Sequence, residues 1–245
     1  MPRFYVPAPL LEDDLLKIGG QEARHLRKVL RLGTGDGIVV FDGSGTEYEG
    51  IIMREDPTVV WIKISRTFCS KEESPVEMIL AQSLLKGEKM DYLIQKTTEL
   101  GVRKIIPFFS SRSVPLPDPS KRLEKHRRWE RIAIEASKQC GRGFIPRVES
   151  LCEYSQMLSM VSVESLRLVL HEKEGIRLKE VLKNFKGKRS LFFIVGPEGG
   201  LSQKEIDESK EKGFVSVFLG ERILRAETAS LCLLSIFQYE WGDMG

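Results

Sequence analysis

Residues 191–228 constrain the fold more than any other stretch of this sequence, because apolar runs alternate with glycine loops in them. The run LFFIV at residues 191–195 stops at a Gly-Pro pair, which predicts a short buried strand. A second apolar run, at residues 215–219, stops at Gly220. We therefore predict two neighbouring strands whose carboxyl ends carry glycine loops, at the edge where open α/β sheets hold ligands.

The segment between the two runs has the sequence of a capped helix. Ser202 and Glu205 form the S-x-x-E pattern of a capping box, in which each side chain accepts a hydrogen bond from the backbone N–H of the other. Leu201 and Ile206 occupy the positions of the accompanying hydrophobic staple. A last helix, expected at residues 226–241, is apolar nearly all round, which suits a core that continues into a dimer interface.

Expected strands and helices alternate from residue 76 onward. Further strands are predicted at residues 76–81, 102–109 and 166–170, and further helices at residues 89–100, 122–140 and 176–185. The strand at 102–109 is expected to break near Pro107. This alternation predicts an α/β domain in which helices cover both faces of a mostly parallel sheet.

The first 70 residues predict a different, β-rich unit. Strands are expected at residues 3–6, 38–41, 48–53 and 59–64, with turn-forming glycines between them. A short amphipathic helix is expected at 21–30, with an apolar side made of Ala23, Leu26, Val29 and Leu30. Closely spaced strands are typical of a small barrel or sandwich. We expect two domains, 1–70 and 74–245, joined at the polar segment 69–75.

Composition limits the class of protein. No apolar run approaches the roughly 20 residues of a membrane helix, and the opening MPRFYVPAPL lacks the apolar core of a signal peptide. The four cysteines have no paired spacing and suit a reduced compartment, and the three histidines form no metal-ligand pattern. We expect a cytoplasmic protein without a membrane span or a metal.

Basic residues are clustered although the net charge is only +3. Residues 121–142 contain eight basic and three acidic residues, a local charge of +5 that suits either a phosphate backbone or a solvated helix face. Arg24, Arg27, Lys28 and Arg31 follow the spacing of one helical face. That face is either a phosphate clamp or simply exposed to water.

The glycine loops match none of the common nucleotide signatures. The P-loop pattern and G-x-S-x-G are absent, and GPEGG is not the G-x-G-x-x-G of a dinucleotide-binding enzyme. By itself, a Gly-Pro-x-Gly-Gly turn is more often structural than ligand-binding. Together, however, the loops expose backbone groups beside the apolar side chains of Leu219, Ile223 and Leu224. This combination suits a flat heteroaromatic group such as adenine.

The same loops carry a resemblance to a known family. GPEGGLS at residues 196–202 and LGERILRAETA at residues 219–229 resemble the RsmE family, the 16S ribosomal RNA uracil-N3 methyltransferases. The segments QSLLKGEKMD at 82–91, KTTELG at 96–101 and HLRKVLR at 25–31 are similar to its other motifs. The resemblance covers essentially the whole chain.

The resemblance implies a SPOUT-type methyltransferase domain with a trefoil knot, preceded by a PUA-like RNA-binding β-barrel. It implies a homodimer that binds S-adenosylmethionine in the knot region, about residues 166–230, and methylates N3 of a uridine in the small ribosomal subunit. The implied cofactor-binding residues are Leu170, His171, Glu172, Val195, Gly196, Pro197, Gly200, Leu219, Gly220, Ile223, Leu224 and Thr228. The expected RNA-binding residues are Arg3, Arg24, Arg27, Arg31, Arg112, Arg128, Arg131 and Arg142.

Methylation at N3 requires loss of the imide proton, and the resulting negative charge spreads onto the uracil oxygens. We predict that Arg225 stabilises this charge, because a guanidinium suits an anionic imide. The alternative role for Arg225 is a phosphate contact or a structural ion pair with Glu227. Glu198 and Glu227 are candidates for the proton acceptor or for anchoring, and Glu227 also suits the amino end of the last helix.

Two other functions remain open at this point. One is a knotted enzyme that methylates the ribose 2′-oxygen of RNA, and the other is a non-catalytic RNA-binding factor in ribosome assembly. The motif at residues 25–31 disfavours the first, and the paired glycine loops with Arg225 disfavour the second.

Overall fold

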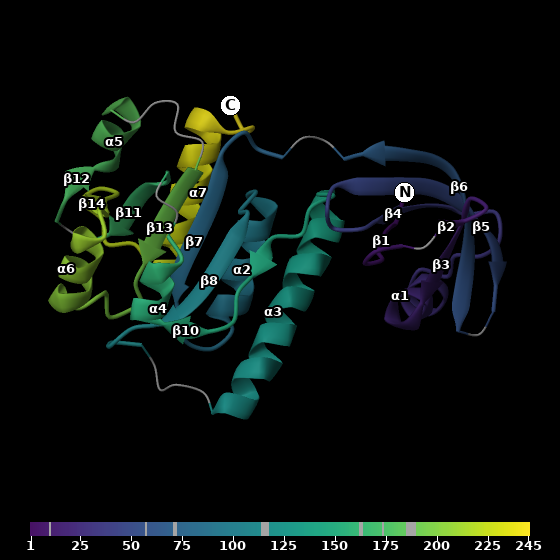
Figure 1. The fold of residues 1–245 in the computed structure, drawn as a ribbon, viewed down its shortest axis with the longest axis horizontal. Helices are drawn as coiled ribbons and strands as arrows, with labels where there is room; N and C mark the ends of the chain where they lie inside the picture. The colour runs from purple at the N-terminus through teal and green to yellow at the C-terminus, as the bar shows by residue number, and fades with distance from the viewer. Residues whose placement is uncertain are drawn as a thin grey trace. The chain divides into compact units, whose positions relative to one another are not determined.

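The computed structural model describes residues 1–9, 11–56, 58–70, 73–113, 118–161, 164–172, 174–184 and 190–245. Their contacts divide the chain into two compact units (Figure 1). The first contains Met1–Glu72 and Ile134–Ile145, and the second contains Glu73–Ala133 and Pro146–Gly245. Part of the segment expected to join two domains, namely residues 71 and 72, lies outside the described residues, as does the end of the helix expected at 176–185.

The second unit is built on a parallel sheet, which confirms the predicted architecture. Its strands lie in the order β10-β8-β7-β13-β11-β14-β12, and β9 pairs with β8 on the side of β10. Every pairing in this sheet is parallel. The strands are β7 (Glu77–Ser83), β8 (Lys104–Phe109), β9 (Arg147–Val148), β10 (Cys152–Glu153), β11 (Leu166–Leu170), β12 (Ile176–Arg177), β13 (Ser190–Val195) and β14 (Val215–Phe218).

Helices cover both faces of this sheet, as predicted. Helices α2 (Lys89–Glu99) and α7 (Ala226–Trp241) pack together on one face, where the ring of Phe193 stacks on Phe237 with 5.8 Å between centroids. Phe192 and Ile194 belong to the core cluster on the other face. That face is covered by α4 (Tyr154–Ser159) and α6 (Gln203–Glu211), and the short helix α5 (Leu178–Asn184) follows β12.

The order of the strands corrects one prediction. Strands β13 and β14, which carry the two glycine loops, are not direct neighbours, because β11 lies between them and pairs with both. The loop after β11 therefore lies between the two glycine loops at the carboxyl edge. The ends of three strands, β13, β11 and β14, thus lie side by side there instead of the two that were predicted.

Pro107 does not break its strand, which is a second correction. Strand β8 runs unbroken from Lys104 to Phe109. The backbone of its odd-numbered residues faces β9 and β10, since the carbonyl oxygen of Ile105 accepts a hydrogen bond from the N–H of Glu149. Strand β9 ends at Val148 and β10 begins at Cys152, so the proline nitrogen faces the gap between them. No ladder hydrogen bond is lost there.

The first unit is the expected β-rich unit. Its sheet has the order β1-β4-β5-β6-β3-β2, in which β1 pairs parallel to β4 and the other pairings are antiparallel. The apolar core includes Phe4, Leu16 and Ile62. The strands are β1 (Arg3–Tyr5), β2 (Leu11–Glu12), β3 (Leu15–Gly19), β4 (Gly37–Phe41), β5 (Thr46–Glu55) and β6 (Val59–Cys69), of which β2 and β3 were not predicted.

The helix expected at residues 21–30 is less regular than predicted. Helix α1 (Gly20–Arg24) continues as a π-helical turn, η1 (His25–Val29), and Arg31 has a left-handed backbone with a φ of 55°. The wider turn shifts the side chains after Leu26, so Val29 is 68% exposed although it was expected on the apolar side. The prediction that Arg24, Arg27, Lys28 and Arg31 share one helical face is therefore wrong.

Helix α3 (Pro119–Cys140) begins earlier than predicted. Its last residues belong to the first unit, where the buried amine of Lys138 lies 2.9 Å from a carboxylate oxygen of Glu22. In the described ranges, no helix is long and apolar enough to cross a membrane.

Candidate functional site

A pocket of about 370 Å³ opens where β11, β13 and β14 end in the second unit. This volume lies in the range of small-molecule sites, roughly 300–1,000 Å³. Eleven of the twelve predicted cofactor-binding residues line it, namely Leu170, His171, Glu172, Val195, Gly196, Pro197, Gly200, Leu219, Gly220, Ile223 and Leu224. The twelfth, Thr228, does not line the pocket and is exposed on the first turn of α7.

Other pocket residues were not predicted to bind the cofactor. Gly199 and Leu201 extend the first glycine loop, and Ala226 and Ala229 present small side chains from α7. The i, i+3 spacing of the two alanines was the available signal, because residues at that spacing lie on one face of a helix.

Two glycines of the pocket lining occupy positions that a larger residue would strain. A Cβ atom at Gly196 would lie 3.1 Å from the backbone nitrogen of Leu201, which is tighter than ordinary van der Waals contact. Gly220 has a φ of +143°, a conformation that other residues adopt only with strain. The loop after β13 closes with a hydrogen bond of 2.9 Å from the N–H of Gly200 to the carbonyl oxygen of Pro197.

The fully buried side chain of Gln82 supports the first glycine loop from the protein core. Its Nε2 lies 3.3 Å from the carbonyl oxygen of Gly196, to which it donates. Its Oε1 accepts a hydrogen bond of 2.6 Å from the hydroxyl of Ser230 in α7. One buried amide thus connects β7, the first glycine loop and the last helix.

The predicted capping box is present, and its glutamate also binds the loop after β8. Glu205 caps α6 with Ser202, and its Oε1 also accepts a hydrogen bond of 2.8 Å from the backbone N–H of Ser111. Burial raises the pKa of Glu205, but the backbone and hydroxyl donors of Ser111 and Ser202 outweigh it and hold that pKa below its usual range. The carboxylate therefore stays ionised and fixes the loop after β8 against α6.

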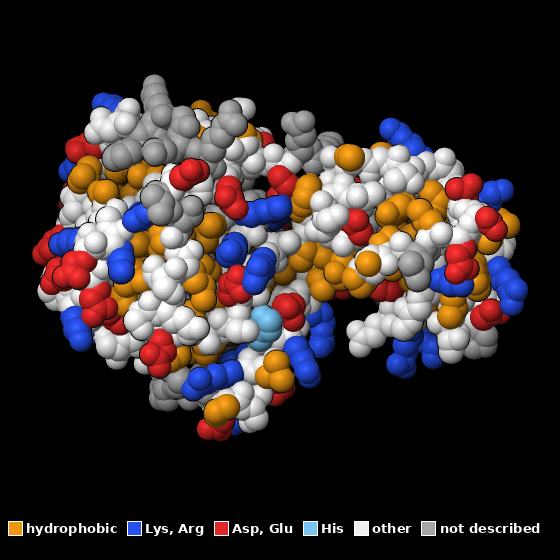
Figure 2. Space-filling view, in the orientation of Figure 1, with side chains coloured by type: hydrophobic (Ala, Val, Ile, Leu, Met, Phe, Trp, Pro, Cys, Tyr) orange, Lys and Arg blue, Asp and Glu red, His pale blue; other side chains and the backbone are white. Residues whose placement is uncertain are grey.

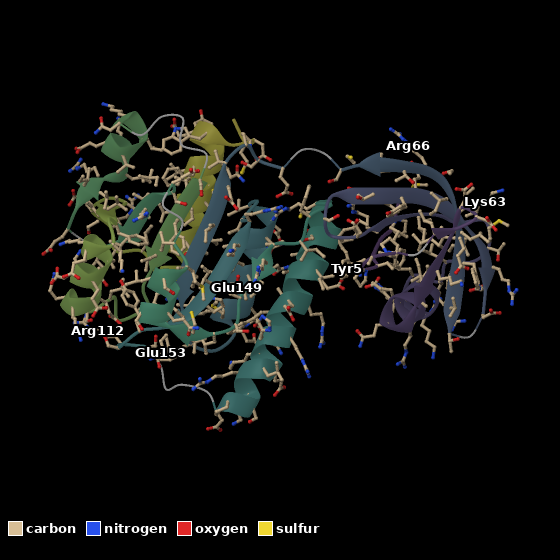
Figure 3. All side chains as sticks on the ribbon, viewed as in Figure 1. Tyr5, Lys63, Arg66, Arg112, Glu149 and Glu153 are labelled. Carbon is tan, nitrogen blue, oxygen red and sulfur yellow. The ribbon has the colours of Figure 1, made fainter. Side chains whose placement is uncertain are left out.

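Arg112 reaches the pocket through this fixed loop. Arg112 lies in the loop after β8 and is labelled in Figure 3. Its guanidinium donates a hydrogen bond of 3.1 Å to the carbonyl oxygen of Gly199, and its side chain lines the pocket. The sequence assigned Arg112 to RNA binding, so its place beside the glycine loop was not foreseen.

Arg225 is the N-cap residue of α7 and lines the pocket. Its side chain is exposed and forms no ion pair with any described residue. Glu227 pairs with Lys89, at 3.5 Å between Oε1 and Nζ, instead of pairing with Arg225. The guanidinium is therefore available to a ligand in the pocket.

Glu198 lines the pocket from the first glycine loop. Its Oε1 lies 3.1 Å from Nζ of Lys89 and 3.3 Å from the backbone nitrogen of Lys86. Burial raises the pKa of Glu198, but its own backbone N–H and the Lys89 ammonium outweigh that effect and lower the pKa. A carboxylate held ionised in this way is a weak base.

The remaining predicted RNA-binding arginines are spread over both units. On α3, Arg131 is exposed, whereas Arg128 pairs with Asp91 at 2.6 Å. Figure 2 shows Lys and Arg side chains on the visible face of this helix. In the first unit, Arg24 and Arg31 are exposed. The others are engaged in protein contacts: Arg3 pairs with Glu47 and donates to the carbonyl oxygen of Arg142, and Arg27 donates to that of Asp56.

The pocket has the features expected for an adenosine-containing cofactor. Main-chain groups at three strand ends surround an apolar wall formed by Leu219 and Leu224. The two glycine loops allow a flat ring to approach the backbone without meeting a side chain. Among the described residues there is no group of His, Cys, Asp or Glu side chains that could hold a metal ion.

Comparisons with known proteins show the family of this chain. Residues 72–238 match the profile described as an RNA methyltransferase domain, and residues 18–65 match an RNA methyltransferase PUA domain. Ribosomal RNA small subunit methyltransferase E of Bacillus subtilis is 32% identical over 98% of this chain and 97% of its own length.

Two solved structures have the same fold. The small subunit methyltransferase E of Neisseria gonorrhoeae, bound to S-adenosylmethionine, has a TM-score of 0.91 at 32% identity, with both chains covered completely. A protein of Legionella pneumophila, solved in complex with the same cofactor, has a TM-score of 0.91 at 33% identity, covering 99% of this chain and 98% of its own. This chain therefore belongs to the RNA methyltransferase family that includes ribosomal RNA small subunit methyltransferase E.

Proposed function

We propose that this protein transfers a methyl group from S-adenosylmethionine to N3 of a uridine in 16S ribosomal RNA. The observation that carries the proposal is the pocket at the three strand ends, with the unpaired guanidinium of Arg225 at its edge. Relatives that share the fold throughout their length were crystallised with this cofactor. The name of the Bacillus subtilis relative supports small-subunit ribosomal RNA as the substrate.

The residues of the pocket divide into those that hold the cofactor and those that face the uracil. When bound, S-adenosylmethionine supplies a methyl group activated on a sulfonium. The backbone at residues 170–172, 195–197 and 219–220 would hold its adenosine part, and Leu219 and Leu224 would supply an apolar surface for the ring. Holding both reactants in one geometry contributes much of the rate of such a displacement.

Arg225 acts on the uracil. Loss of the imide proton leaves negative charge on the uracil oxygens, and the exposed guanidinium donates hydrogen bonds to it. Glu198 and Glu227 serve as anchors in this proposal, because each faces Lys89 and the lowered pKa of Glu198 makes it a poor proton acceptor.

The rest of the chain delivers the RNA. The first unit, part of which matches a PUA domain, is proposed to bind RNA together with the exposed arginines of α3. We propose a homodimer through α7, in which Leu231 and Ile236 remain half-buried in the single chain. A trefoil knot within residues 166–230 and action in the cytoplasm complete the proposal.

Calorimetric titration with S-adenosylmethionine tests the proposal directly. We expect saturable binding with one cofactor per chain. The Gly220→Ala variant should bind more weakly, with a larger dissociation constant, because an alanine at this φ is strained. A titration without heat and without a thermal shift would favour the non-catalytic assembly factor. Mass spectrometry of the methylated nucleoside separates methylation at N3 from methylation of the ribose.

A further inference from the structure

Lys89 connects three segments beside the pocket. It is the first residue of α2, and its side chain is 33% exposed. Its Nζ lies 3.1 Å from Oε1 of Glu198 and 3.5 Å from Oε1 of Glu227. The backbone nitrogen of Lys86, in the loop before α2, also donates to Glu198.

The two carboxylates belong to different segments of the second unit, and Glu198 lines the pocket. Glu198 lies in the first glycine loop, whereas Glu227 lies in the first turn of α7, two residues after Arg225. Both approach one ammonium group within 3.5 Å, so they would repel each other if that charge were removed. The side chain of Lys89 thus stands where the first loop and the start of α7 meet.

Glu227 depends on this contact more than Glu198 does. Its Oε2 is buried and has no hydrogen-bond partner in the described structure, so Lys89 is the partner that orients this carboxylate. Glu198 keeps the backbone N–H of Lys86 as a second donor. Loss of the ammonium would leave Glu227 as an uncompensated, largely buried charge at the amino end of α7.

We infer that Lys89 is a positioning residue that holds the first glycine loop and the amino end of α7 in register through Glu198 and Glu227. Arg225 lies directly before α7, so the same contact sets where its guanidinium meets the substrate. The inference rests on the proposed function for the identity of the ligand. The coupling of the two carboxylates through Lys89 is independent of that identity.

The test compares three variants of the full chain. Lys89→Met removes the charge and keeps the length of the side chain, and Lys89→Arg keeps a cation. Lys104→Met is the matched control, since Lys104 has a side-chain exposure of 31% and pairs with Glu149 at 3.8 Å. Lys104 is the first residue of β8, and the pocket lies at the opposite, carboxyl edge of the parallel sheet.

The first part of the test measures cofactor binding and methylation kinetics. We expect Lys89→Met to weaken S-adenosylmethionine binding about tenfold, equivalent to about 1.4 kcal/mol. The KM for the cofactor should rise and kcat should fall, while the KM for RNA stays unchanged. Lys89→Arg should recover most of the loss, and Lys104→Met should behave as wild type. Equal binding and rates for Lys89→Met and Lys104→Met would overturn the inference.

The second part of the test needs no ligand. Urea unfolding of Lys89→Met, Glu227→Gln and the double variant measures their coupling, and we expect clear non-additivity. Additive effects would contradict the inference even if the enzyme is active. If the wild-type protein binds no S-adenosylmethionine, the proposed function is wrong, and this cycle still decides whether Lys89 holds Glu227.

Discussion

The hydroxyl of Ser230 donates a hydrogen bond of 2.6 Å to Oε1 of Gln82, and both side chains are completely buried. Ser230 belongs to α7 and Gln82 to β7, which are far apart in the sequence. Because Gln82 also donates to the carbonyl oxygen of Gly196, the last helix is linked to the first glycine loop through the core.

Ser230→Ala should therefore destabilise the fold. The substitution leaves Oε1 of Gln82 buried without this donor, which costs about 1–3 kcal/mol in the free energy of unfolding. Urea denaturation measures this change. Ser159→Ala is the control, since the hydroxyls of Ser230 and Ser159 both donate to a backbone carbonyl of their own helix but Ser159 is exposed. The effect of Ser159→Ala should stay below about 0.5 kcal/mol. Equal effects of the two variants would contradict the account.

Glu205 should make stability depend on acid pH. Its pKa is lower in the folded protein than the ordinary value of 4.5. The stabilisation is therefore complete above pH 4.5 and is lost as the pH falls through the lower folded value. Glu205→Gln should be less stable at neutral pH and should show a smaller loss below pH 4.5, measured as unfolding free energy against pH. Glu211→Gln, exposed at the end of α6, should keep the wild-type profile.

Arg225→Ala should lose catalysis more than cofactor binding. Removal of a group that stabilises developing negative charge costs roughly 10²–10³-fold in kcat. Single-turnover methylation and calorimetry measure the two effects separately. Arg225→Lys should recover only part of the rate, because an ammonium lacks the planar fork of a guanidinium. A near wild-type rate for Arg225→Ala would remove Arg225 from the chemistry.

Arg131 should contribute to the salt dependence of RNA binding. Its side chain is exposed on α3, as is that of Arg128, but Arg128 pairs with Asp91 at 2.6 Å. If Arg131 contacts a phosphate, Arg131→Ala should reduce the slope of log affinity against log salt by roughly 0.7–0.9. Arg147→Ala serves as the control, since Arg147 is 71% exposed and pairs with Glu149 outside α3. An unchanged slope for Arg131→Ala would exclude the phosphate contact.

Local signals predicted the elements around the site accurately. The capping box of Ser202 and Glu205 and the last helix, α7, lie where the sequence placed them. Both depend on neighbours within one or two helical turns, so a single stretch of sequence contains the information. The same holds for the backbone openings created by Gly196 and Gly220.

Features set by distant contacts were missed. The position of β11 between β13 and β14 depends on strand pairing across the sheet, which no local pattern encodes. Arg112 reaches the pocket because Glu205 holds its loop through the backbone N–H of Ser111. Ser111 and Glu205 are 94 positions apart in the sequence. Val29 is exposed because the π-helical turn after Arg24 changes the helical repeat on which the prediction relied.

The most direct measurement uses small ribosomal subunits from a strain that lacks this protein. The subunits are incubated with the purified protein and S-adenosylmethionine carrying a labelled methyl group, and the RNA nucleosides are then separated by mass spectrometry. The account predicts labelled N3-methyluridine at a single position of 16S RNA, and an initial rate of labelling roughly 10²–10³-fold lower with the Arg225→Ala variant. Label on a ribose 2′-oxygen, or no labelled nucleoside with the wild-type protein, would contradict it.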